Sequence, residues 1–73
     1  MSDELPEWVK EGVVFRVKLN LEDELWHVRG IVDDLAICRR WNQVGQRWVY
    51  EVHNKCFFEV WAPHITIRSS RAG

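Results

Sequence analysis

The fold class of this chain is decided by the stretch Val13–Leu19, which reads VVFRVKL. Its odd positions are all apolar, while Arg16 and Lys18 occupy even positions between them. Because successive side chains of a strand point to opposite faces, this period of two predicts a β-strand with one buried face. Similar short patterns, which together predict five strands, recur at residues 25–32, 35–41, 47–53 and 56–61.

Short polar connections separate the predicted strands. Residues 20–24 are interpreted as a loop, Asp33-Asp34 as a tight turn, and residues 42–46 as a hairpin loop in which Gly45 supplies a positive φ. Gly30, inside the second predicted strand, indicates a β-bulge. Connections this short leave no room for crossover helices, so we expect an antiparallel sheet. Strands with a single apolar face must curl to bury it, which predicts a half-open barrel.

The N-terminal residues predict one helical turn in front of the sheet. Pro6 suits the first turn of a helix, and Gly12 suits the position just after a helix ends. Residues 1–11 are therefore expected to form a short helical turn segment that covers an open end of the barrel.

The C-terminal residues predict a break followed by a last β segment. Pro63 interrupts the pattern because proline has no N–H to donate to a sheet. The period of two resumes at residues 65–68, and residues 69–73 are expected to form a flexible tail. A chain of 73 residues has no room for a second core, so we expect one domain spanning residues 1–73.

Composition limits the partners and the compartment. The net charge is −1, with 29% charged residues and the two signs interspersed. Without a basic block, nucleic-acid binding is not expected. The acidic N-terminus lacks the apolar core of a signal peptide, and we expect a cytoplasmic protein without a membrane span. Cys38 and Cys56 are both expected to be reduced, buried apolar residues.

The pattern of residues 12–68 resembles the SH3-like barrels of bacterial and mobile-element proteins. The stretch Phe58–Trp61 is similar to the pore-lining strand of type II dihydrofolate reductases, although Glu59 stands where that family has glutamine and no equivalent of its pore lysine is found. Residues 12–17 and Cys38–Trp41 resemble small bacterial proteins of the integron-cassette type. The reductase resemblance implies a pore shared by four subunits and a nicotinamide cofactor.

Candidate metal ligands and nucleophiles are scattered along the chain. They are His27, His53, His64, Cys38 and Cys56. None of them forms the closely spaced pairs of a structural zinc site. Neither cysteine has the setting of an activated nucleophile. We therefore expect no metal, no cofactor and no catalytic residue.

The aromatic side chains form the candidate site. If Asn54-Lys55 is a two-residue turn, Tyr50 lies opposite Glu59, and Trp48 lies diagonally across from Trp61. One hairpin face then carries most of the aromatic side chains. The predicted ligand or interface residues are Trp41, Trp48, Tyr50, Phe57, Glu59 and Trp61.

Three roles are open for this aromatic face: core, ligand platform, or interface between copies of the chain. Tyrosine and tryptophan beside a carboxylate hold cations, bases or proline ridges, and they also concentrate at protein interfaces. Both faces of the fourth and fifth predicted strands are apolar, so one face must lie outside a single barrel. We expect a non-catalytic interaction module that self-associates through these strands and binds a protein segment or a small ligand. The alternatives are a pore-type reductase and a nucleic-acid-binding barrel.

Overall fold

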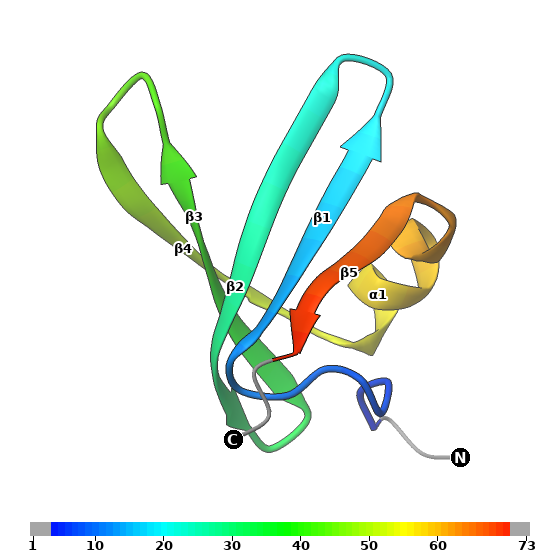
Figure 1. The fold of residues 1–73 in the computed structure, drawn as a ribbon. Helices are drawn as coiled ribbons and strands as arrows, with labels where there is room; N and C mark the ends of the chain where they lie inside the picture. Colours follow the sequence, from blue (N-terminus) through cyan, green and yellow to red (C-terminus); the bar gives the residue numbers. More distant parts are fainter. Residues whose placement is uncertain (1–3, 71–73) are drawn as a thin grey trace.

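The computed structural model describes residues 4–70 of the chain. Its elements, in chain order, are β1 (Val13–Leu19), β2 (Glu22–Val32), β3 (Leu35–Asn42), β4 (Arg47–His53), α1 (Lys55–Trp61), a 3₁₀ turn (Ala62–His64) and β5 (Ile65–Ser70) (Figure 1). All the strand pairs are antiparallel, and they form one sheet in the order β4-β3-β2-β1-β5. The all-β class and the antiparallel sheet predicted from the period of two are therefore confirmed.

The sheet is strongly coiled and open. β4 and β5 are its two edges, and α1 lies between the end of β4 and the start of β5 (Figure 1). The pairing of β2 with β3 runs only from Val32↔Leu35 to His27↔Arg39. Beyond that point the β1–β2 hairpin and the β3–β4 hairpin diverge, as Figure 1 shows. The molecule therefore has a closely paired end and a divided end.

The segment predicted as a fifth strand is a helix. Asn54, predicted as part of a hairpin turn, has an extended backbone and a side-chain oxygen that accepts a hydrogen bond from Phe57 N at 3.2 Å. This is the geometry of a helix N-cap. Phe58 is buried in the core, and Phe57 and Trp61, four positions apart, are half-buried. The apolar run suits one face of a helix as well as a strand, and the Asn54 cap favours the helix. The last strand is β5, which continues to Ser70 through the first residues of the predicted tail; residues 71–73 lie outside the described residues.

The N-terminal segment forms hydrogen-bonded turns and not the helical turn that was predicted. Val9 N donates to Pro6 O at 3.0 Å, and Val13 N donates to Lys10 O at 3.1 Å. Gly12 has a φ of 95°, which turns the chain into β1. Residues 1–3 of the predicted segment lie outside the described residues. Two turns held by single bonds do not reach the length at which a helix propagates.

One predicted turn and the predicted β-bulge are confirmed, and two predicted loops are wrong in detail. Asp33-Asp34 forms a two-residue turn, and the register between β2 and β3 shifts at Gly30 as a bulge requires. The predicted loop 20–24 shortens to a tight turn, because Asn20 adopts a φ of 57° and β2 begins at Glu22. Asparagine tolerates this left-handed backbone better than most residues. In the loop between β3 and β4, the positive φ is found at Gln46 and not at Gly45.

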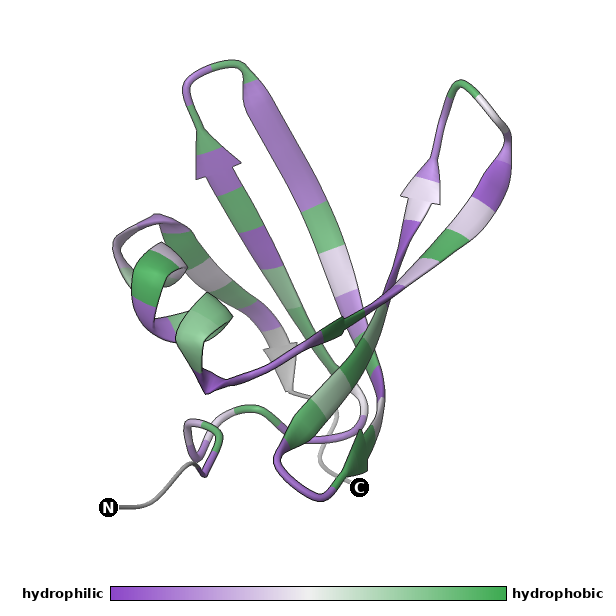
Figure 2. Ribbon diagram, turned by 180° about the vertical axis from the view of Figure 1, so that it is seen from behind, coloured by the Kyte–Doolittle hydropathy of each residue, from purple (hydrophilic) through white to green (hydrophobic). Residues whose placement is uncertain are grey.

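The core lies on one face of the sheet, under α1 and the N-terminal turns. Hydrophobic and hydrophilic residues alternate along β1 (Figure 2). Phe15, on the apolar side, is fully buried, and its ring centroid lies 5.7 Å from that of Phe58 in α1. Trp8 contacts both rings edge-on, with centroids 5.5 Å away. Cys38 is buried here as predicted, but Cys56 is exposed in the first turn of α1. We call this side of the sheet the inner face and the opposite side the outer face.

Candidate functional site

Three of the predicted site residues come together on the outer face. In the register of β3 with β4, Trp41 lies opposite Trp48, and Arg39 lies opposite Tyr50. Paired residues of an antiparallel sheet point to the same side, so these four side chains share one face. Trp41, Trp48 and Tyr50 are 46%, 38% and 56% exposed. We refer to these three residues as the aromatic platform.

Contacts between neighbouring side chains hold the aromatic platform in place. The rings of Trp41 and Trp48 meet edge-to-face, with centroids 5.3 Å apart. The Arg39 guanidinium carbon lies 3.9 Å from the Trp48 ring centroid, within the range of a cation–π contact. Arg39 also donates to the Tyr50 hydroxyl at 3.2 Å. The platform is therefore a fixed arrangement of exposed rings with a cation attached to it.

His27 extends the platform onto β2. Its ring lies edge-on to Trp48 at 5.6 Å, and it pairs with Arg39 in the sheet. Burial lowers the pKa of His27, and the positive charges of Arg39 and Arg29 lower it further. His27 is therefore expected to be neutral at pH 7, so it adds a flat polar ring and not a charge.

The other three predicted site residues lie in α1, away from the platform. Phe57 stacks on His53, with ring centroids 3.7 Å apart and an interplanar angle of 10°. Trp61 is half-buried against the core. Glu59 is exposed and forms an ion pair with Lys55 at 3.8 Å, one helical turn away. The predicted register that placed Phe57, Glu59 and Trp61 beside β4 is wrong, because it required residues 56–61 to be a strand.

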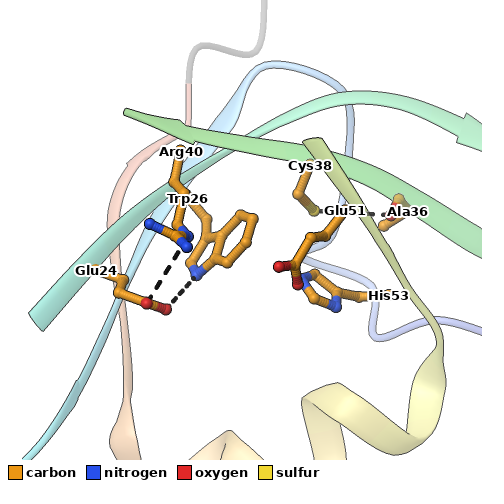
Figure 3. Close-up of polar contacts among 7 residues, drawn as sticks. All are labelled: Glu24, Trp26, Ala36, Cys38, Arg40, Glu51 and His53. Carbon is orange, nitrogen blue, oxygen red and sulfur yellow. Dashed lines mark hydrogen bonds and ion pairs between the residues drawn. The ribbon is translucent and has the colours of Figure 1, made fainter. Parts of the chain in front are cut away.

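The inner face carries a polar cluster contributed by β2, β3 and β4 (Figure 3). Trp26, only 3% exposed, donates from Nε1 to Glu24 Oε1 at 3.3 Å. The other Glu24 oxygen lies 3.8 Å from Arg40 Nε. On β4, Glu51 Oε1 lies 3.7 Å from His53 Nε2. We call these five residues the inner polar cluster.

The inner polar cluster has the chemistry of a structural network. Burial lowers the pKa of His53, although the nearby Glu51 carboxylate partly opposes this. The His53 ring packs edge-on against Trp26 at 4.9 Å and is 8% exposed. Burial, with a further contribution from Glu51, raises the pKa of the neighbouring Cys38 thiol to about 12. A thiol that stays protonated at neutral pH is a poor nucleophile.

Sequence reasoning missed Arg39 and the inner polar cluster. The signal for Arg39 was its place two residues before Trp41 in a predicted strand, which puts both on one face. Glu24 was assigned to a loop, so its position two residues before Trp26 did not indicate that the two side chains share one face of a strand. Among the described residues, no group of three or more His, Cys, Asp or Glu side chains lies close enough to hold a metal ion.

Three comparisons with known proteins found no match. No model of a protein family, no curated protein and no solved structure matches the chain. In residues 4–70, no helix has the length and apolar character needed to cross a membrane.

Proposed function

We propose that this protein is a small non-catalytic binding module of the SH3-like type, and that it acts through the aromatic platform. The strand order with β1 between β2 and β5, and the 3₁₀ turn before the last strand, support the SH3-like assignment. The observation that carries the function is the exposure of Trp41, Trp48 and Tyr50 on one sheet face, outside the core. Adjacent exposed aromatic side chains are typical of binding surfaces.

Nuclear magnetic resonance of the tryptophan indole N–H groups tests this function. The full chain is titrated with proline-rich peptides, acidic peptides and short oligonucleotides. We expect at least one of these ligands to shift the indole signals of Trp41 and Trp48 and to leave that of buried Trp26 in place. If every ligand leaves Trp41 and Trp48 unchanged, or if Trp26 responds first, the platform is not the binding surface.

The proposal includes self-association through the free edge of β4. This strand lies at the edge of the sheet and is exposed along most of its length. Edge strands with apolar side chains pair readily with another chain unless charges or prolines prevent it. In a two-fold antiparallel pair centred on Val49, Arg47 lies opposite Glu51 of the second copy, and Trp48 lies opposite Tyr50 of the second copy. This register is self-complementary in charge and in shape, and it joins the two aromatic platforms.

Charge reversal distinguishes this register from other modes of association. Sedimentation of the wild-type chain at micromolar concentration is expected to give a dimer of the 8.8 kDa chain. Arg47→Glu alone and Glu51→Arg alone each place like charges opposite one another, and both should weaken the dimer. The double variant restores the opposite pairs and should restore the dimer. A monomeric wild type, or a double variant weaker than both single variants, contradicts the register.

The reductase alternative has no supporting observation. Its resemblance rested on Phe58–Trp61 as a pore-lining strand, but these residues lie in α1 and Phe58 is 2% exposed in the core. A titration with reduced nicotinamide cofactor, followed by tryptophan fluorescence, is expected to give no change.

A further inference from the structure

Strand alternation sorts the charges that are interspersed in the sequence. The cations that alternation places on the outer face are Arg16, Lys18 and Arg39. Arg29 and Arg68 lie at register shifts, and their charges act on His27 and Asp23 of this face. Within the described strands, the one carboxylate on this face is that of Asp23. Glu24 and Glu51 point to the inner face, where they belong to the inner polar cluster (Figure 3). A chain with a net charge of −1 therefore has a sheet face on which cations outnumber carboxylates.

The ionisation of neighbouring groups reflects this positive surface. Arg16 and Asp23 are joined by a two-bond ion pair, and the hydrogen bond lowers the pKa of Asp23. The charges of Lys18 and Arg68 lower it as well. On the platform side, the charges of two arginines lower the pKa of His27 in addition to burial. Cations of β1 and β5 therefore act on Asp23, and cations of β2 and β3 act on His27.

A row of paired residues on the outer face links the two hairpins that carry the platform and the cations of β1. Across the sheet, Tyr50 pairs with Arg39, Arg39 pairs with His27, and His27 pairs with Val14 of β1. Adjacent strands are about 4.8 Å apart, so this row crosses about 14 Å from β4 to β1. The row leads from exposed aromatic rings to the cations of β1 without an intervening carboxylate in the described strands. That is enough room for a few nucleotides of an extended chain.

We infer that the outer face binds single-stranded nucleic acid, with bases stacked on Trp41, Trp48 and Tyr50 and phosphates paired with the cations of β1, β2 and β3. This inference rests on the proposed function and names its ligand. Single-strand binding combines a basic track for the backbone with aromatic rings on which bases stack. Arg39 can contribute both a positive charge for a phosphate and a flat surface for a base, since guanidinium planes also stack on bases. A base-paired duplex hides the base faces that the platform contacts, so unpaired strands are the preferred form.

Fluorescence anisotropy with the full chain tests the inference. The probe is a labelled oligo(dT) of about 12 nucleotides, within the site sizes of small single-strand-binding folds. We expect Trp48→Ala and Trp41→Ala each to weaken binding about tenfold, which is within the range for the loss of one base stack. Trp48→Phe keeps a stacking ring and should lose less affinity than Trp48→Ala. Circular dichroism establishes that each variant is folded.

Salt dependence tests the phosphate contacts. The logarithm of the association constant should fall linearly with the logarithm of salt concentration, and Arg39→Gln should reduce the slope by about 0.7, the value for one phosphate of a single strand. The matched control is Lys55→Gln. It also removes one positive charge, but from α1, which packs on the inner face. The control should bind within about twofold of wild type, because a single distant charge is largely screened at physiological salt.

Three results would overturn the inference. The first is no binding of oligo(dT) at low salt. The second is equal affinity in wild type, Trp48→Ala and Arg39→Gln. The third is competition by a duplex of equal length as strong as by the single strand, which would reduce the interaction to charge alone. If oligonucleotides fail but peptides shift the indole signals of Trp41 and Trp48, this inference is wrong and the proposed function stands.

Discussion

The two faces of the sheet use the same residue type for opposite purposes. Trp26 on the inner face is 3% exposed, packs against His53 and donates its indole N–H to Glu24. Trp41 on the outer face is 46% exposed and contacts its neighbour Trp48 edge-on. Composition cannot separate these roles, because both residues lie in strands of similar sequence. Position in the alternating pattern separates them, and it sorts the acidic and basic side chains in the same way.

The largest expected effect is on stability, and it distinguishes the two faces directly. Trp26→Ala removes a buried ring and should lower the free energy of unfolding by about 3–5 kcal/mol. Trp48→Ala removes one exposed aromatic contact and should cost about 1 kcal/mol. Urea denaturation followed by circular dichroism measures both. If Trp26→Ala leaves too little folded protein, Trp26→Phe should still be less stable than Trp48→Phe. Equal losses on the two faces would contradict the assignment of inner and outer faces.

The next effect is a pH dependence that comes from the inner polar cluster. The pKa of His53 is lowered in the folded protein, so the unfolded chain takes up a proton first as the pH falls. Stability from this group is therefore present above the unfolded pKa of about 6.5 and is lost as the pH falls through the folded value. One proton gives a slope of at most about 1.4 kcal/mol per pH unit.

The His53 contribution is measured as the difference in unfolding free energy between pH 7 and pH 5. His53→Gln should show a smaller drop than wild type over this range. The pKa of His27 is also lowered, so His27→Gln is the matched comparison on the outer face. This variant should remove only the part of the stability loss between pH 7 and pH 5 that comes from His27, and should leave the His53 contribution in place. An unchanged drop in His53→Gln would mean that its pKa is not lowered by burial.

A smaller effect tests the segment where sequence and structure disagree. Asn54→Ala removes the side chain that accepts from Phe57 N, and it should cost about 1 kcal/mol of stability. Asn54→Asp keeps an accepting oxygen and should cost less. Thermal unfolding resolves the two variants. If the alanine and aspartate variants are equally stable, Asn54 does not cap α1.

The strands β1 and β4 were predictable because each has a period of two, and β3 because turn residues flank it on both sides. The helix α1 was not, since the run Cys56–Trp61 is almost wholly apolar and has no clear period. Asparagine suits both a tight turn and a helix N-cap, so Asn54 did not decide between them. This error had one large consequence. The prediction paired residues 56–61 with β4, whereas the last strand is β5, which pairs with β1.

The candidate site was predictable only where it depends on the β3–β4 hairpin. The proximity of Trp41 and Trp48 was predictable because the β3–β4 hairpin was assigned correctly. The basic character of the outer face was not predicted, because charges that alternate along the sequence look mixed until each strand is assigned its two faces. Arg29 and Arg68 lie at register shifts, where simple alternation does not place a side chain.

Quenching of tryptophan fluorescence by ions of opposite charge measures whether the exposed rings of Trp41 and Trp48 lie on a basic surface. Trp41 and Trp48 are the exposed tryptophans of the described chain, and Arg39 lies over one of them. Relative to their quenching of free N-acetyltryptophanamide, iodide should therefore quench more strongly than caesium, because cations raise the local concentration of anions. This preference should shrink in Arg39→Gln and disappear in the double variant Trp41→Phe, Trp48→Phe. Equal normalised quenching by the two ions, or a preference that survives in the double variant, would mean that Trp41 and Trp48 do not lie on a basic surface.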